Sequence, residues 1–305
     1  MLSNLKQQAI KGTKLVSSCV IFIFGSVAVA KAPVVLMTDF GLTDGAVSTM
    51  KGVIYTVEPN LTISDLSHNV EAFNIQEASY RLYQVMQYYP KGTVFVSVVD
   101  PGVGTTRKSI VAETNNGYYI VTPDNGTLTN IAAAYGIKEI REIDETKNRL
   151  ENSEKSHTFY GRDVFAYTGG KLAADKITFA EVGPNVLKDY IKFPIKTSEV
   201  RNNVIYGNVL ILDGDYGNLW TNISPENLKQ IGVEVGKNIQ VEILDKKNKV
   251  IYRKKIHYGN TFGDVKFGSD VSYLNSLGNF AIAINQSNFA KKYKISPEYK
   301  VIVKN

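Results

Sequence analysis

Short apolar runs alternate with helix-like stretches between Val34 and about Pro194, and this alternation constrains the fold more than any other feature of the chain. Such runs, bounded by turn residues, are typical of strands that are buried on both faces. Buried strands separated by amphipathic helices predict an α/β fold with a mostly parallel sheet. The expected strands are 34–38, 62–66 and 93–99, with a hairpin over 110–113 and 118–121; the expected helices are 44–57, 75–89, 129–135 and 163–174.

The pattern changes after Lys196 to short strands in which polar and apolar residues alternate. This predicts a smaller, antiparallel β domain with strands over 204–212, 239–244, 250–256 and 280–285. A chain of 305 residues is long enough for two ordinary domains. We therefore expect an α/β N-terminal domain over 31–196 and a β-rich C-terminal domain over 197–305, with a charged, exposed loop near 144–156.

The first thirty residues have the features of a secretory signal peptide. Lys6, Lys11 and Lys14 precede an apolar stretch over 15–30 that ends in the small-x-small sequence Ala-Val-Ala. The stretch is short for a membrane span, so cleavage after Ala30 is the favoured interpretation and an uncleaved anchor is the alternative. Cleavage predicts an exported protein, periplasmic or secreted, without stable membrane association.

Charge and cysteine content exclude several functional classes. Without the leader, 32 basic residues face 29 acidic ones, so the net charge falls from +6 to +3. With no basic helix, zinc-ligand spacing or RNA-binding motif, we expect neither a nucleic-acid partner nor a bound metal. Cys19, the only cysteine, lies in the leader, so the mature chain is expected to form no disulfide.

A glycine-rich turn between Val99 and Arg107 follows the third expected strand and begins with Asp100. Open α/β sheets bind ligands at the carboxyl ends of their strands, so Asp100 is a candidate site residue. Arg107 can return to this carboxylate as a bidentate partner that keeps it ionised and oriented. From this segment alone, a structural ion pair that caps the turn is an equally good interpretation.

Two other segments carry candidate ligand contacts. Asp39 directly follows the first strand, where a carboxylate can accept both hydroxyls of a ribose; the alternative is an N-cap of the next helix. Phe159 and Tyr160 precede Gly161 at the start of a helix, and either cover a flat ligand ring or pack in the core.

Six motifs follow one another along the chain: Thr-Asp-Phe-Gly at 38–41, Val-Asp-Pro-Gly-Val-Gly at 99–104, Pro-Asp-Asn-Gly at 123–126, Thr-Phe-Tyr-Gly-Arg-Asp at 158–163, Gly-Asn-x-x-Thr-Asn-Ile at 217–223 and Leu-Asn-Ser-x-Gly at 274–278. In this order they resemble the S-adenosylmethionine hydroxide adenosyltransferases, the adenosine-forming S-adenosylmethionine hydrolases, which are related to fluorinating and chlorinating enzymes. The resemblance extends from about Val34 to Ala290.

The resemblance implies a homotrimer in which the ligand lies between the N-terminal domain of one subunit and the C-terminal domain of the next. It implies that Asp39 holds the ribose diol and that Phe73 and Phe159 line the ribose and adenine region. The C-terminal residues that it assigns to methionine or adenine are Asp213, Tyr216 and Asn218, with Ser276 and the backbone of Leu277 completing the site.

The hydrolases of this family are characterised by an Asp-Arg-His triad that orients a water or hydroxide, and Asp100 and Arg107 match its first two members. The third position is Tyr160, a phenol that is a poor base at neutral pH but can hydrogen-bond a water polarised by Asp100. His157, three residues earlier, is expected to face solvent. The halogenating relatives also have tyrosine here, but they replace the aspartate with an uncharged aromatic residue, because a carboxylate repels a halide. Asp100 therefore favours water.

The expected reaction is displacement by water at the ribose C5′ of S-adenosyl-L-methionine, which yields adenosine and L-methionine. The sulfonium is already a good leaving group, so a positioned water in a buried cleft suffices for the displacement. Neither a metal nor a cofactor is expected. The small adenosyl compound itself is the expected substrate. Two alternatives stay open. A halide-dependent, chlorinase-like adenosyltransferase would need halide to form product, and a non-catalytic binder of adenosyl compounds would bind without turnover.

Overall fold

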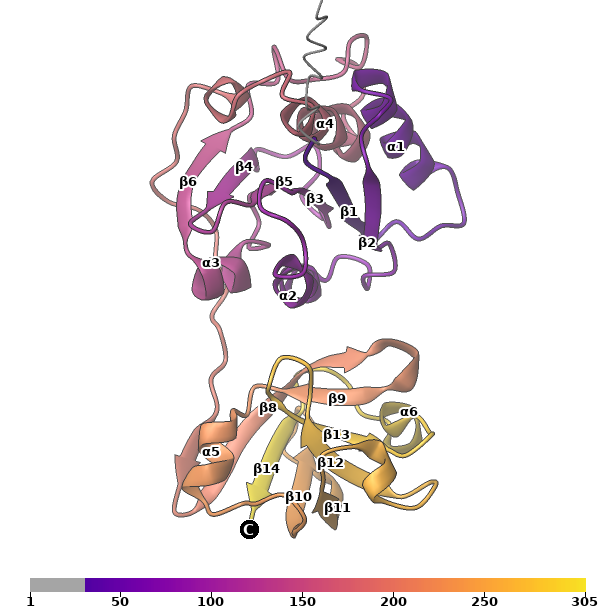
Figure 1. Cartoon of the computed structure of the whole chain (residues 1–305), viewed down its shortest axis with the longest axis vertical. Helices are drawn as coiled ribbons and strands as arrows, with labels where there is room; N and C mark the ends of the chain where they lie inside the picture. Colours follow the sequence, from indigo (N-terminus) through magenta and orange to yellow (C-terminus); the bar gives the residue numbers. More distant parts are fainter. Residues whose placement is uncertain (1–30) are drawn as a thin grey trace, which may run out of the picture. The chain divides into compact units, whose positions relative to one another are not determined.

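The computed structural model describes residues 31–305, so the expected signal peptide and its cleavage site lie outside the described residues. Two sheets organise this part of the chain, one of six strands and one of eight (Figure 1). The α/β class and the antiparallel β class expected for the two halves are both confirmed.

The six-stranded sheet has the strand order β2-β1-β3-β5-β4-β6. β2, β1, β3 and β5 are mutually parallel, and β4 runs antiparallel to both of its neighbours, β5 and β6. The strands are β1 (Val34–Thr38), β2 (Ile63–Ser67), β3 (Val94–Val98), β4 (Ser109–Thr114), β5 (Tyr119–Pro123) and β6 (Ile137–Glu142).

Helices cover this sheet on both faces, α1 and α4 on one and α2 and α3 on the other (Figure 1). They are α1 (Ala46–Val57), α2 (Ile75–Met86), α3 (Thr129–Tyr135) and α4 (Tyr167–Ala173). β1 shows why both faces are covered: Val34 and Leu36 pack into one core cluster, and Val35 and Met37 into the other. Each such side chain stabilises the fold by about 1.5–3 kcal/mol on burial.

The eight-stranded sheet has the order β14-β10-β11-β12-β13-β9-β8-β7, and an additional β14–β8 pairing closes it on itself. Every pairing except β11–β12 is antiparallel. Its strands are β7 (Glu199–Arg201), β8 (Val204–Asp213), β9 (Asn218–Thr221), β10 (Asn238–Leu244), β11 (Val250–Tyr258), β12 (Asp270–Leu274), β13 (Phe280–Ile284) and β14 (Lys300–Lys304). Two short helices, α5 (Pro225–Gln230) and α6 (Phe289–Tyr293), accompany it. Along β8 buried and half-buried residues alternate, as expected for strands with one face on a core.

Some boundaries differ from the expectations. The helix expected over 75–89 ends at Met86, and that expected over 163–174 is a π-helix, Gly161–Ala166, continued by α4. A π turn has no periodicity signature of its own. The prediction of an exposed loop near 144–156 is wrong in part, because Asn148 and Ser153 are buried. Asn148 donates to the carbonyls of Glu181 and Val182 at 3.1 and 2.9 Å, which ties this loop to the domain.

Within residues 31–305, every helix is too short or too polar to cross a bilayer.

Candidate active site

Pairing of β1 with β3 brings the two candidate carboxylates to the same edge of the sheet. Thr38 and Val98, the last residues of these strands, are register partners. Asp39 follows the first directly, and Asp100 comes two residues after the second. Both therefore lie at the carboxyl end of the parallel strands, where open α/β sheets bind ligands.

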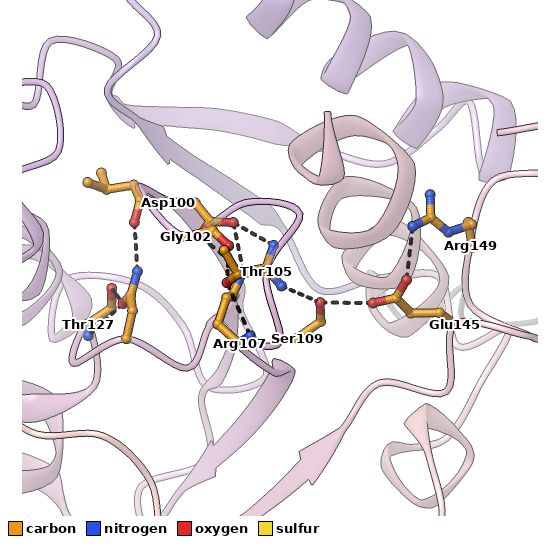
Figure 2. A network of polar contacts seen from close by, with 10 residues as sticks. Asp100, Gly102, Thr105, Arg107, Ser109, Thr127, Glu145 and Arg149 are labelled. Carbon is orange, nitrogen blue, oxygen red and sulfur yellow. Dashed lines mark hydrogen bonds and ion pairs between the residues drawn. The ribbon is translucent and has the colours of Figure 1, made fainter. Parts of the chain in front are cut away.

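Asp100 and Arg107 form a buried, forked ion pair (Figure 2). Arg107 Nε donates to both carboxylate oxygens at 3.0 Å, and Nη2 donates to Oδ2 at 2.6 Å. The two side chains are only 5% and 8% exposed. Water screens such a pair little, so the carboxylate is held in one orientation.

The turn between the two residues needs its glycines. Gly104 has a φ of +77°, and a Cβ there would lie 3.0 Å from the carbonyl oxygen of His157. Thr105 closes the turn, since its N–H and its hydroxyl both bond the Gly102 carbonyl, at 3.1 and 2.7 Å. Conformation and space both disfavour a side chain at position 104, and the tight turn lets Arg107 return to Asp100.

The polar network extends beyond this ion pair (Figure 2). Arg107 Nη1 donates to Ser109 Oγ at 2.8 Å, and this hydroxyl donates to Glu145 Oε1 at 3.2 Å. Glu145 in turn accepts from Arg149 Nη2 at 2.9 Å. Acidic and basic groups thus alternate along one chain of contacts, so each charge has an opposite neighbour.

Tyr160 contacts both arginines of this network. The guanidinium carbons of Arg107 and Arg149 lie 4.8 and 4.7 Å from the centre of its ring. Such cation–π contacts each contribute about 0.5–2 kcal/mol, depending on desolvation. The structure thus brings Tyr160 to the Asp100–Arg107 pair, whereas His157 is exposed, as expected.

Asp39 does not cap the helix that follows it. The N-cap of α1 is Gly45, and Asp44 bonds the Ala46 N–H at 2.9 Å. Asp39 Oδ2 instead accepts from the backbone N–H of Phe73 at 2.9 Å. The N-cap interpretation is therefore wrong, and the carboxylate is held at the strand end.

The aromatic candidates of the N-terminal half occupy different environments. Phe159 is half-buried, with its ring 6.0 Å from that of Phe40 in an edge-to-face arrangement. Phe73 is 70% exposed and adopts a φ of +67°, which is uncommon for a bulky residue. Phe73 also lines a cavity of about 850 Å³, formed with residues 71–77, 210–212, 296–298 and Lys246.

The candidate residues of the C-terminal half lie together on the β domain. Asp213, Tyr216 and Asn218 line a cavity of about 560 Å³. Asn218 Nδ2 donates to Asp213 Oδ2 at 3.1 Å, while Tyr216 is 72% exposed. Burial raises the pKa of nearby Tyr273 to about 12, and the negative charge of Asp213 acts in the same direction. That phenol is therefore protonated at neutral pH.

The Leu-Asn-Ser-x-Gly turn is less accessible to a ligand than expected. Ser276 is exposed, but the N–H of Leu277 already donates to Asn275 Oδ1 at 3.0 Å. A backbone contact at Leu277 would therefore have to come from its carbonyl.

The candidates thus form two groups. Asp39, Asp100, Arg107, Phe159 and Tyr160 gather at the edge of the six-stranded sheet, and Asp213, Tyr216 and Asn218 gather on the β domain. Across residues 31–305, no hydrogen bond or ion pair joins the two groups, and no cluster of three His, Cys, Asp or Glu side chains suited to a metal occurs.

Several residues that lie beside these two groups were not predicted from the sequence. Glu145 and Arg149 lie in the segment expected to be an exposed loop, where their spacing of four residues was the available signal. The cavity beside Asp213 is also lined by Phe262 and residues 284–288. These residues carry no motif; the pairing of β13 with β9 brings residues 284–288 beside Asp213 and Asn218.

Comparison with known proteins agrees with this geometry. The domain models described as "SAM hydroxide adenosyltransferase N-terminal domain" and "C-terminal domain" match residues 34–183 and 207–302. An (R)-S-adenosyl-L-methionine hydrolase of Methanocaldococcus jannaschii is 34% identical over 84% of this chain and 86% of its own length. A fluorinase of Nocardia brasiliensis is 28% identical over 89% of this chain and 96% of its own length. The crystal structure of an uncharacterized conserved protein from Thermotoga maritima superposes with a TM-score of 0.82 at 33% identity, covering 89% of this chain and all of the other. The chain therefore belongs to the SAM hydroxide adenosyltransferase family.

Proposed function

We propose that the protein hydrolyses S-adenosyl-L-methionine to adenosine and L-methionine. The buried, forked Asp100–Arg107 pair at the carboxyl edge of the parallel sheet is the observation that supports this best. Water has to be aimed at a carbon that already carries a sulfonium leaving group, and a carboxylate of fixed orientation can accept a hydrogen bond from that water.

The reaction is an in-line displacement at C5′. The water oxygen forms a bond to C5′ while the C5′–S bond breaks, and the electron pair of that bond remains on sulfur as the neutral thioether of methionine. The water proton passes to Asp100 and then to solvent. Arg107 keeps the carboxylate oriented, and the Tyr160 hydroxyl orients the same water.

For the remaining candidates we propose the binding roles that the family resemblance implies. Asp39 accepts hydrogen bonds from the ribose diol, and Phe73 and Phe159 line the ribose and adenine region. Asp213, Tyr216 and Asn218 contact methionine or adenine, with Ser276 and the carbonyl of Leu277 beside them. Because no hydrogen bond or ion pair joins the two groups within residues 31–305, we propose a homotrimer in which neighbouring subunits complete each site.

Three further proposals accompany this function. The chain divides into domains over 31–196 and 197–305. The hydrolysis needs no cofactor, because the sulfonium activates its own carbon.

Residues 1–30 direct export, which predicts a mature protein that begins at Lys31. Amino-terminal sequencing of the exported protein tests that start.

Halide transfer is the second candidate function, favoured by Tyr160 and by the similarity to fluorinases. A negative carboxylate beside the attacking atom opposes it, because Asp100 would repel an incoming halide. We therefore expect chloride to leave the reaction unchanged.

The deciding experiment incubates the purified protein with S-adenosyl-L-methionine in oxygen-18 water, with and without chloride, and identifies the nucleosides by mass. We expect adenosine that carries the label at its 5′ oxygen, formed at the same rate in both conditions. A 5′-chlorinated nucleoside would instead assign halide transfer. Binding measured by calorimetry without any nucleoside product would assign a non-catalytic binder.

A further inference from the structure

His68 is a buried imidazole at the end of β2 that the proposed chemistry does not use. Its side chain is only 2% exposed. Nδ1 lies 2.8 Å from the hydroxyl of Thr38, which is itself completely buried at the end of β1. On the other side, Nε2 lies 3.1 Å from Asp65 Oδ1, so the ring is in close polar contact with this carboxylate.

The Thr38 hydroxyl links His68 to the backbone of the following turn. The backbone N–H of Phe40 donates to Thr38 Oγ1 at 3.2 Å, so this hydroxyl accepts from the backbone. The same oxygen shares a hydrogen bond with His68 Nδ1, because a hydroxyl can take part in more than one such bond. Lys51 of α1 pairs with Asp65 at 2.6 Å and fixes that carboxylate from outside.

These contacts hold the turn that carries Asp39. His68 reaches the turn twice: its side chain acts through the Thr38 hydroxyl on the Phe40 N–H, and its carbonyl accepts the Gly41 N–H at 2.7 Å. Asp39 directly precedes these two anchored amides. One residue therefore fixes the backbone on the carboxyl side of Asp39.

The segment that begins with His68 also contacts the Asp39 side chain. It continues to Phe73, whose N–H donates to Asp39 Oδ2 at 2.9 Å. The same short loop thus sets both the backbone that carries the carboxylate and the direction in which the carboxylate points.

We propose that the Asp65–His68–Thr38 chain is a positioning device for Asp39, and that it determines the affinity of the site for the ribose diol. The inference rests on the proposed function for the identity of the ligand. His68 and Thr38 act through Asp39 and do not touch the reacting atoms. Loss of the chain should therefore weaken binding of the sugar without slowing the displacement at C5′.

The test replaces Thr38 by valine, which has the same shape but no hydroxyl. Thr38→Val should raise KM for S-adenosyl-L-methionine and the Kd for adenosine about tenfold, and should leave kcat within about twofold. Thr38→Ser restores the hydroxyl and should restore both constants. Thr122→Val is the matched control, because Thr122 is a fully buried threonine whose hydroxyl has no hydrogen-bond partner within residues 31–305.

Calorimetry with 2′,3′-dideoxyadenosine separates positioning of Asp39 from a general loosening of the fold. This ligand lacks the diol, so Thr38→Val should bind it as the wild type does. If Thr38→Val does not fold, Asp65→Asn provides the second variant, because Asp65 is partly exposed and its replacement should raise the adenosine Kd about threefold.

Two results would overturn the inference: an unchanged adenosine Kd in the variants, or an equal loss of affinity for the dideoxy ligand. Wild-type protein that binds adenosine but forms none from S-adenosyl-L-methionine would refute the proposed hydrolysis alone. The comparison of ribose and dideoxyribose ligands would still decide the role of His68.

Discussion

Replacing Asp100 by asparagine removes one negative charge and almost no volume from the centre of the proposed site. Arg107 would keep its hydrogen bond to Ser109 and its contacts with the rings of Tyr160 and Phe165. It would lose the negative carboxylate of Asp100, which accepts three of its hydrogen bonds. Breaking a buried ion pair usually costs about 3–5 kcal/mol. Because these contacts remain, we expect a loss of about 3 kcal/mol in the free energy of unfolding, measured by urea denaturation.

The same change should affect catalysis far more than this loss of stability explains. The amide that Asp100→Asn introduces is neutral and cannot take the water proton, so kcat for adenosine formation should fall by about 10²–10⁴. Chromatographic measurement of adenosine on protein shown to be folded by circular dichroism gives this number. KM should change little, because the carboxylate acts on the water and not on the nucleoside.

Asp270→Asn is the matched control. Asp270 is also only 5% exposed and accepts hydrogen bonds from Lys254, Tyr252 and Tyr293, but it lies in the β domain. The Asp270→Asn variant should lose a similar amount of its free energy of unfolding and should keep the wild-type kcat. A folded Asp100→Asn that retains half of the wild-type kcat would refute the catalytic role. An equal fall of kcat in both variants would make the Asp100–Arg107 pair merely structural.

Two further predictions concern the surroundings of this pair. Tyr160→Phe keeps the ring and its contacts with the two guanidinium groups, so the free energy of unfolding should change by less than about 0.5 kcal/mol. If the hydroxyl orients water, kcat should fall about tenfold. An unchanged kcat would remove that role. Burial raises the pKa of Asp124 above its usual 3.8, so the folded state binds this proton more readily than the unfolded chain does. The wild type should therefore lose stability relative to Asp124→Asn as the pH rises from about 4 toward neutrality, as urea midpoints across that range would show; parallel curves would contradict this.

The sequence predicts the parts of this structure that depend on local patterns. Uninterrupted apolar runs identify β1 and β3, and the register of buried parallel strands then places Asp39 and Asp100 at one edge. The glycines after Asp100 indicate a turn tight enough for Arg107 to return. These features need only period, burial and turn chemistry, all of which neighbouring residues encode.

The unpredicted parts depend on contacts between distant segments. Arg149 reaches Tyr160 because the 144–156 loop folds back through the buried Asn148 amide, which no periodicity indicates. The positive φ of Phe73 is likewise imposed by tertiary contacts, since an isolated phenylalanine avoids that conformation. Closure of the β domain through β14 and β8 joins strands that are almost a hundred residues apart.

The contacts of Tyr160 with two arginines give a physical reason for a tyrosine where the resemblance to the family's hydrolases leads us to expect histidine. The electron-rich faces of a phenol ring attract cations, so Arg107 and Arg149 stabilise the ring. A histidine in the same place would have two positive groups beside it, which oppose protonation of an imidazole. Arg149 and Tyr160 therefore fit together as a pair, and under the proposed hydrolysis we expect Asp100 to take the proton of the attacking water.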